Sequence, residues 1–389
     1  MSACWSIKSQ VDFKNSNLIT RMNTLFKNRT VVYILMILIV CSCQKAGQKI
    51  KATVKSQDKT YTNPILPVGN KPWAIYQNGY YYYTQETGSN VEIWKTKDLT
   101  NLRNAPHKVV WVPDDPKSSH DLWSPEIHFI DGKWYIYYEA DDGNSDNHQI
   151  YVVENTAKDP LEGKFTFKGR ISTDKNNNWA IHPDVFKHRG SLYMTWSGWQ
   201  SRRVSVEHQC IYIAKMENPW TLASERVLLS KPELEWERQW INPDGSKTSH
   251  TIYVNEAPQF FHSKNSDKIY IFYSASGLWT PYYAIGKLTA DANSDLLNPA
   301  SWKKSDRPVF KQSPQDSIFS TGNCCFVPSP DGKEYYMLYH ARKIPNEPPG
   351  AKDSRSPRLQ KIEWSKDGTP YFSVPIPESV VLPKPSGTL

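Results

Sequence analysis

Dense runs of aromatic and β-branched residues, each preceded by a short polar turn, recur along the chain. The runs are NGYYYYT (78–84), DGKWYIYYEA (131–140), RGSLYMTWSG (189–198), SDKIYIFYSA (266–275) and DGKEYYMLYHA (331–341). A polar pair before an aromatic run is typical of a tight β-hairpin, and no helical period of apolar residues interrupts the series. The pattern therefore predicts a succession of antiparallel strands.

Two further apolar stretches flank each of these runs. Those before the turns are KPWAIY, SPEIHFI, HPDVFKH, EAPQFFHS and NCCFVPS, and those after the runs are VEIWKT, HQIYVVE, QCIYIAK, YYAIGKL and PRLQKIEW. Units of three or four antiparallel strands, repeated at intervals of about 50 to 80 residues, are typical of a propeller. The pattern predicts an all-β fold, a five-bladed β-propeller over residues 61–378, with a C-terminal tail at 379–389. A β-sandwich is the alternative, but it does not explain five near-equivalent copies.

The N-terminal region has a different character. Residues 31–40 read VVYILMILIV, follow Lys27 and Arg29, and precede the sequence CSC. This run is too short to span a bilayer, which takes roughly 20 apolar residues, but it suits the apolar core of a secretory signal peptide. The residues around Cys43 resemble a bacterial lipoprotein signal, in which Cys43 carries the lipid. An uncleaved membrane anchor is the alternative.

This signal divides the start of the chain and also changes its charge. We interpret residues 1–43 as a leader with its true start at Met22, and residues 44–60 as a polar tether. The whole chain has 47 Lys and Arg against 39 Asp and Glu, a net charge of +8. The leader contributes five of the basic residues and one of the acids, so 42 and 38 remain. Because the remaining charges are mixed and form no basic run, we expect no nucleic-acid partner.

The stretch before each turn is expected to be the innermost strand of its blade. A proline stands near the start of most of these stretches, a position where a strand needs no ladder donor. In a propeller the starts of the innermost strands meet at one mouth of a central channel. Buried charges there are costly unless they are paired or used. The candidate site residues at these strand starts are Lys71, Trp73, Trp123, Glu126, His182, Asp184, Glu256 and Asn323.

Four stretches of the sequence are distinctive, namely DLWSPEIHFIDGKWYIYY, VNEAP, YHAR and RLQKIEWSKDGTP. They resemble glycoside hydrolase family 43, and the likeness is greatest to its exo-acting α-L-arabinofuranosidases. The resemblance runs from about Tyr61 to about Pro377 and implies inverting hydrolysis of a furanosyl or xylosyl linkage in plant polysaccharide. Inversion needs one carboxylic acid that protonates the leaving oxygen and one carboxylate that activates water. The resemblance assigns the acid to Glu256 of NEAP.

Three positions depart from the family pattern. Lys71 stands where the family has its catalytic base, an Asp before a Pro, and an ammonium cannot accept a proton unless its pKa is strongly lowered. His182 stands where a third carboxylate normally tunes the acid, and Asp184 follows two residues later. Because side chains alternate along a strand, 182 and 184 are expected to share a face. Asn323 replaces a His that often lies near a central metal ion.

These departures leave three interpretations open. The first is an active hydrolase with a rebuilt base, supplied by Asp184, Glu126, or a neutral Lys71 or His182. The second is an enzyme whose substrate carries its own acid, phosphate or amide and is bound by Lys71. The third is a carbohydrate-binding propeller that has lost catalysis.

The remaining expectations concern ligands and surroundings. Trp73 and Trp123 are candidate platforms for a sugar ring, and Trp199 and Trp279 lie in loops that could wall the site. Glu126 is expected to accept hydrogen bonds from sugar hydroxyls. Hydrolysis requires no cofactor, although the resemblance allows a structural Ca2+ in the central channel near Asn323. We expect an exported, monomeric protein in the bacterial cell envelope, held by its lipid at the outer membrane, with an oligosaccharide or polysaccharide as its partner.

Overall fold

The computed structural model describes residues 59–202, 208–239, 252–262, 266–346 and 354–388. The predicted leader, the lipid anchor at Cys43 and nearly all of the tether lie outside the described residues. By its contacts, Tyr61–Leu389 forms one compact unit, and the description below concerns that unit. None of the helices among the described residues is both long and apolar enough to cross a membrane.

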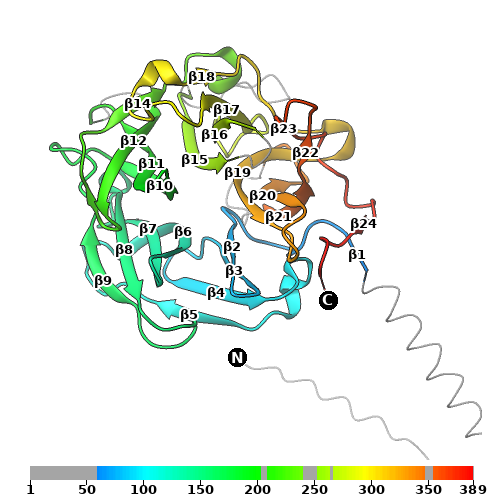
Figure 1. Cartoon of the computed structure of the whole chain (residues 1–389), viewed down its shortest axis with the longest axis horizontal. Helices are drawn as coiled ribbons and strands as arrows, with labels where there is room; N and C mark the ends of the chain where they lie inside the picture. Colours follow the sequence, from blue (N-terminus) through cyan, green and yellow to red (C-terminus); the bar gives the residue numbers. More distant parts are fainter. Residues whose placement is uncertain (1–58, 203–207, 240–251, 263–265, 347–353, 389) are drawn as a thin grey trace, which may run out of the picture. The chain divides into compact units, whose positions relative to one another are not determined.

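Five antiparallel sheets follow one another along the chain and form the blades of a propeller (Figure 1). Blade 1 holds β2 (Trp73–Gln77), β3 (Tyr80–Thr84), β4 (Val91–Thr96) and β5 (His107–Trp111). Blade 2 holds β6 (His120–Ile130), β7 (Lys133–Asp141), β8 (Gln149–Asn155) and β9 (Thr166–Arg170). Blade 3 holds β10 (Ala180–His188), β11 (Ser191–Trp199), β12 (Gln209–Asn218), β13 (Thr221–Leu222) and β14 (Val227–Ser230). Blade 4 holds β15 (Asn255–His262), β16 (Lys268–Ala275), β17 (Ala284–Asp291) and β18 (Lys303–Lys304). Blade 5 holds β19 (Phe319–Pro328), β20 (Tyr335–Arg342) and β21 (Ser356–Lys361).

Short elements complete the described structure. They are β1 (Thr60–Tyr61), which pairs with β24 (Leu382–Pro383), β22 (Glu363–Trp364), which pairs with β23 (Pro370–Tyr371), and the 3-10 helices η1 (Leu99–Asn104), η2 (Ser145–Asn147), η3 (Glu235–Arg238), η4 (Pro299–Ser301) and η5 (Pro314–Asp316). The innermost strands β2, β6, β10, β15 and β19 lie nearest the axis in Figure 1. The propeller predicted from the repeats is confirmed.

The predicted polar turns form tight hairpins in the first three blades. Asn78 and Gly79 both have a left-handed backbone, with φ of 53° and 81°, and the pairing Gln77↔Tyr80 closes a two-residue loop. Asp131-Gly132 and Arg189-Gly190 repeat this geometry. Two successive left-handed residues make a type I′ turn, which matches the right-handed twist of paired strands.

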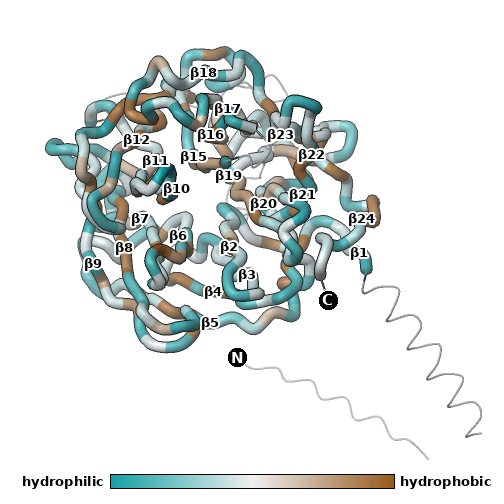
Figure 2. The backbone as a smooth tube through the Cα atoms, in the orientation of Figure 1, coloured by the Kyte–Doolittle hydropathy of each residue, from teal (hydrophilic) through white to brown (hydrophobic). Residues whose placement is uncertain are grey.

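The hydrophobic core lies between neighbouring blades. Strand β3 shows how: Tyr81 and Tyr83 pack with residues of blade 5, whereas Tyr82 packs with residues of blade 2. Side chains of a strand alternate between the two faces of its sheet, so one aromatic run serves two interfaces. Similar clusters join blade 2 to 3, blade 3 to 4 and blade 4 to 5. Figure 2 shows the matching pattern, with many apolar segments along the strands and polar ones at many connections. The aromatic excess of the sequence is therefore largely a requirement of the fold.

The ring of blades closes at its first residues. The Tyr61 hydroxyl donates to the carbonyl oxygen of Leu359 at 3.1 Å. The Asn63 amide donates to the same oxygen at 3.0 Å and accepts the Leu359 N–H at 2.8 Å. These contacts attach the start of the unit to β21, the outermost strand of the last blade, and so link blades 5 and 1.

Candidate active site

A shared backbone feature marks the start of the innermost strands. Each start has at least one residue with a left-handed backbone, and these residues include Lys71, Ser124, His182, Ala257 and Asn323, with φ between 38° and 51°. In β6, β10, β15 and β19 the strand register shifts at the residue named. Such a backbone is strained for residues other than glycine, and strained residues cluster at functional sites. A bulge of this kind redirects a side chain, and four of the five blades have one at the strand start.

Buried polar residues gather near these strand starts, and we call them the polar ring. Its members are Lys71, Glu139, His182, Glu256, Tyr283 and His340, and each is at most 7% exposed. The Lys71 backbone N–H donates to Nδ1 of His340 at 3.1 Å, and the His340 ring stacks on Tyr283 with centroids 5.8 Å apart. The predicted residues Lys71, His182 and Glu256 are thus brought together.

Two side chains lie beside the carboxyl of Glu256. The Tyr283 hydroxyl donates to Oε1 at 2.7 Å, and Nδ1 of His182 lies 3.9 Å from Oε2. Asn323 donates its amide to the same Tyr283 hydroxyl at 2.8 Å. Asn323 therefore orients the tyrosine that orients Glu256.

Glu139 is a ring member that the sequence reasoning missed. Its Oε1 accepts the backbone N–H of His182 at 2.6 Å, and the side chain is fully buried. Burial raises the pKa of Glu139 to about 8, although the nearby Lys71 ammonium opposes this shift. Burial and the Lys71 charge hold the pKa of His182 well below its usual range. Glu139 could have been found from the sequence, since it is an acid within the apolar run KWYIYYEAD. Glu is almost never fully buried without a partner, so an acid in such a run indicates a functional or paired carboxylate.

The expectation that His182 and Asp184 share a face is wrong. The register of β10 shifts between Ile181 and Asp184, and His182 lies within this bulge, so the alternation of side chains is interrupted. Asp184 instead accepts the backbone N–H of Phe260 at 2.6 Å. It groups with Glu126 and His128, and ligand atoms of the three lie within 4.8 Å of one another.

This second group, Glu126, His128 and Asp184, is buried and crowded. Burial raises the pKa of Glu126 well above its usual range, and the nearby Asp184 adds to this effect. Burial raises the pKa of Asp184 to about 7 and lowers that of His128 to about 3. The structural Ca2+ expected in the central channel near Asn323 stays a prediction. Asn323 itself directs its amide to Tyr283.

Asp184→Asn is expected to change how stability depends on pH. Between its ordinary pKa of 3.8 and about 7, folded Asp184 keeps a proton that the unfolded chain releases. Its contribution to the free energy of unfolding therefore falls as pH rises, by up to about 1.4 kcal/mol per pH unit. Urea denaturation from pH 4 to 7 should show this fall in the wild type relative to the variant. If the difference in free energy of unfolding between wild type and variant does not change with pH, the pKa of Asp184 is not raised. Asp131→Asn, in an exposed turn, serves as the control.

The predicted tryptophans differ in their surroundings. Trp73 donates to the Ile127 carbonyl at 2.8 Å and lies beside His128. Trp123 stacks on His148 with ring centroids 3.8 Å apart and lies under the Lys71 ammonium. Trp199 is 2% exposed and stacks on Trp179, whereas Trp279 is 40% exposed. Of the four, Trp279 presents the most ring surface to solvent.

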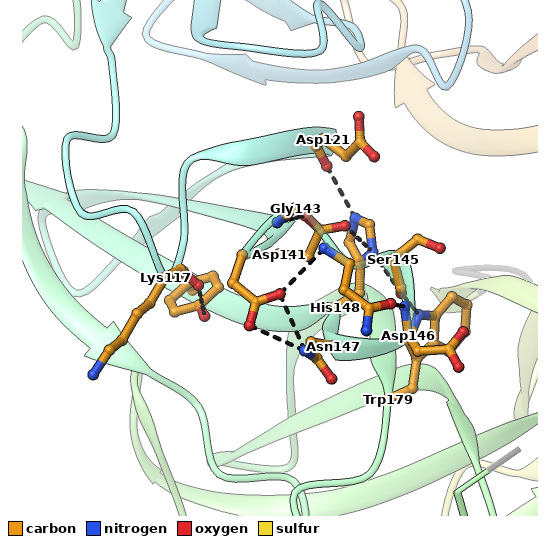
Figure 3. A network of polar contacts seen from close by, with 12 residues as sticks. Lys117, Asp121, Asp141, Gly143, Ser145, Asp146, Asn147, His148 and Trp179 are labelled. Atoms are coloured by element: carbon orange, nitrogen blue, oxygen red, sulfur yellow. Dashed lines mark hydrogen bonds and ion pairs between the residues drawn. The ribbon is translucent and has the colours of Figure 1, made fainter.

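The loop 141–147 contacts the rings of His148 and Trp179 (Figure 3). Nδ1 of His148 lies 3.0 Å from the Asp141 carboxylate, and Nε2 lies 3.0 Å from the Asp121 carbonyl. Trp179 donates its Nε1–H to the Ser145 carbonyl at 2.8 Å. These contacts hold the rings of His148 and Trp179, on which Trp123 and Trp199 stack.

Comparisons with known proteins show the family to which the chain belongs. The sequence model of glycosyl hydrolases family 43 matches residues 61–370. An extracellular exo-α-(1→5)-L-arabinofuranosidase of Streptomyces avermitilis is 35% identical over 84% of this chain and 66% of its own. α-L-Arabinofuranosidase 43 of Humicola insolens is 32% identical over 82% of this chain and 64% of its own. The chain thus spans about two thirds of the length of these curated relatives.

A solved structure extends the comparison to the fold. The α-L-arabinofuranosidase from Lactobacillus brevis has a TM-score of 0.74 at 32% identity, over 82% of this chain and 98% of its own. The resemblance read from WSPEIHF and NEAP is therefore confirmed at the level of the family. The chain belongs to family 43 of the glycosyl hydrolases.

Proposed function

We propose that the protein is an exo-acting glycosidase that removes α-L-arabinofuranosyl residues from arabinan or a related plant glycan, with inversion. The proposal is carried by the position of Glu256, whose carboxyl lies in the polar ring beside Tyr283 and His182. It is supported by the relatives at 31–35% identity, which are described as arabinofuranosidases. Relatives described as extracellular support export of this chain as well.

In this proposal Glu256 is the general acid. Its proton passes to the glycosidic oxygen as the bond between that oxygen and the anomeric carbon breaks. A second carboxylate takes a proton from water, and the water oxygen attacks the opposite face of the anomeric carbon. The Tyr283 hydroxyl, which donates to Oε1 at 2.7 Å, fixes the direction of the Glu256 carboxyl.

The base candidates named from the sequence are poorly placed for the second role. Lys71 is ion-paired with Glu86 at 2.5 Å, and an ammonium so paired has no lone pair to accept a proton. His182 is 1% exposed. Asp184 accepts the backbone N–H of Phe260 in β15, and Glu126 accepts the side-chain amide of Gln259. We therefore propose that the base is another residue.

Two other functions remain as alternatives. A carbohydrate-binding propeller without catalysis is favoured by one observation, the lysine in place of the base. Recognition of an anionic glycan by Lys71 is less well supported, because Glu86 already neutralises its charge.

A product screen tests the proposed function. The purified protein is incubated with arabinan, arabinoxylan and pectic fractions, and released sugars are separated by chromatography. We expect free arabinose and no larger early products from arabinan. If no sugar is released while calorimetry shows binding, the non-catalytic alternative is correct. Release only from fractions rich in uronic acid would favour the anionic substrate.

Gly322→Ala is expected to reduce turnover by displacing Tyr283. A methyl group at Gly322 would lie 2.1 Å from Cε1 of Tyr283, so the ring must move. Loss of one hydrogen bond between neutral groups corresponds to about 0.5–1.5 kcal/mol, or roughly a twofold to tenfold fall in kcat. Tyr283→Phe should give a similar fall, measured on arabino-oligosaccharides. If Tyr283→Phe retains full kcat, Tyr283 does not orient the acid.

A further inference from the structure

A carboxylate that the sequence reasoning did not consider lies against the residue at the base position. Nζ of Lys71 is 2.5 Å from Oε2 of Glu86, and the two side chains are 6% and 19% exposed. Glu86 follows β3, on the same blade as Lys71. The Glu86 carboxylate therefore lies beside the polar ring on blade 1, next to Lys71.

The segment that carries Glu86 is fixed to the strand start. The Glu86 N–H donates to the Asn70 carbonyl at 3.3 Å. The Gln85 side chain accepts the Tyr83 hydroxyl at 2.7 Å and fills the space where a Cβ on Gly69 would lie, only 2.0 Å from that Cβ position. The Gly69 backbone, with φ of 157°, thus lies against the side chain of Gln85, the residue that directly precedes Glu86.

Lys71 is held just as firmly. Its backbone N–H donates to His340, and its ammonium lies 4.4 Å from the ring centroid of Trp123. A charge-assisted hydrogen bond between two constrained groups fixes the carboxylate in direction as well as in distance. Removal of either partner leaves the other charge poorly compensated in a mostly buried place.

We propose that Glu86 is the catalytic base of this protein and that Lys71 is the residue that positions it. The inference rests on the proposed function, since it names the second carboxylate of that reaction. Three carboxylates lie at or beside the ring, and they differ in access to water. Glu139 is completely buried and accepts the His182 N–H, and Glu256 is 5% exposed, whereas Glu86 retains 19%.

Glu86 follows β3 of blade 1, and Glu256 lies in β15 of blade 4. Blade 1 packs against blades 2 and 5, and blade 4 packs against blades 3 and 5. The two carboxylates therefore come from non-adjacent blades, and β2 and β15 lie on opposite sides of the axis in Figure 1. An inverting mechanism needs its acid and base on opposite sides of the sugar, roughly 6.5–9.5 Å apart with water between them.

The step balances without any further reactant. The Glu86 carboxylate takes one proton from water while the water oxygen bonds to the anomeric carbon. The bond from that carbon to the leaving oxygen breaks, and this oxygen receives the proton of Glu256. Exchange with solvent then returns Glu86 to the carboxylate and Glu256 to the acid.

Substitution of Glu86 provides the first test. With arabino-oligosaccharides, Glu86→Gln should lower kcat about a hundredfold or more, because general base catalysis contributes a factor of this size. Glu86→Asp, which keeps the carboxylate, should retain more activity than Glu86→Gln. Asp291→Asn, at an exposed ion pair on blade 4, is the matched control and should leave kcat unchanged. Circular dichroism and thermal unfolding establish that each variant is folded.

Azide distinguishes a base from a merely structural residue. With an aryl arabinofuranoside, Glu86→Ala should recover activity when azide is added, because the anion attacks the anomeric carbon in place of activated water. The expected product is a glycosyl azide of inverted configuration, with the aryloxide expelled. An active wild type whose folded Glu86 variants keep full kcat, or lose it without azide rescue, would overturn this inference. An inactive wild type would instead overturn the proposed function.

A charge exchange tests the role of Lys71. Lys71→Asp alone should lower kcat about a hundredfold, because two carboxylates would then face each other. The double variant Lys71→Asp with Glu86→Lys restores an ion pair with its ends exchanged, and we expect at least a tenfold recovery. If Lys71→Asp alone is more active than the wild type, the lysine merely replaced a lost base and Glu86 is not the catalytic carboxylate.

Discussion

Glu256→Gln should lower kcat on arabino-oligosaccharides by about a thousandfold, within the range of 10²–10⁴ that general acid catalysis contributes. The amide cannot donate a proton to the leaving oxygen, yet its oxygen can still accept the Tyr283 hydroxyl that now contacts Oε1. KM should therefore change little. Initial rates over a series of substrate concentrations separate the two constants.

The leaving group provides the internal control for this variant. A dinitrophenyl arabinofuranoside releases a stable phenolate and needs no proton from the protein. The variant should therefore hydrolyse it within about tenfold of the wild-type rate, since general acid assistance no longer limits the step. If both substrates lose activity equally, Glu256 has another role, such as orienting the sugar.

Glu237→Ala should lower the free energy of unfolding more than any of the substitutions named above. Glu237 is fully buried in η3 and accepts hydrogen bonds from Tyr273 at 2.8 Å and from the Asn255 amide at 3.0 Å. It is also ion-paired with Lys304 at 2.6 Å. Removing one partner of a buried pair leaves the other charge uncompensated and costs about 3–5 kcal/mol. Urea denaturation should show this fall in the free energy of unfolding.

The same substitution should also disturb the site, because Asn255 directly precedes Glu256. Glu235→Ala is the matched control: it lies in the same short helix, is exposed, and should change the free energy of unfolding by less than about 0.5 kcal/mol. If Glu237→Ala costs no more than this control, the buried network does not stabilise the start of β15.

The repeats predicted the blades because each blade must present apolar residues to two neighbours. The same reasoning aligned the strand starts, so Lys71, His182 and Glu256 were correctly expected to meet. It failed at Asp184, because alternation assumes a regular strand and a bulge at His182 interrupts β10. A single bulged residue is not visible in the hydrophobic pattern.

Residues outside the innermost strands were beyond the reach of that reasoning. Glu139 and His340 lie on second strands, Tyr283 immediately precedes β17, and Glu86 follows β3. Their contacts with the ring depend on how the second strands and the connecting segments pack against the innermost strands. The ion pair of Lys71 with Glu86 is such a contact. From the sequence, Lys71 was the residue that replaces the base; with this contact, we interpret it as the partner of another carboxylate.

The anomeric form of the first product tests the central claim most directly. An α-(1→5)-linked arabino-oligosaccharide is incubated with the protein in an NMR tube, and the anomeric protons are followed before mutarotation. The proposed inverting hydrolysis predicts that β-L-arabinofuranose appears first and the α anomer only later. First appearance of the α anomer, or no arabinose from folded protein, would contradict it.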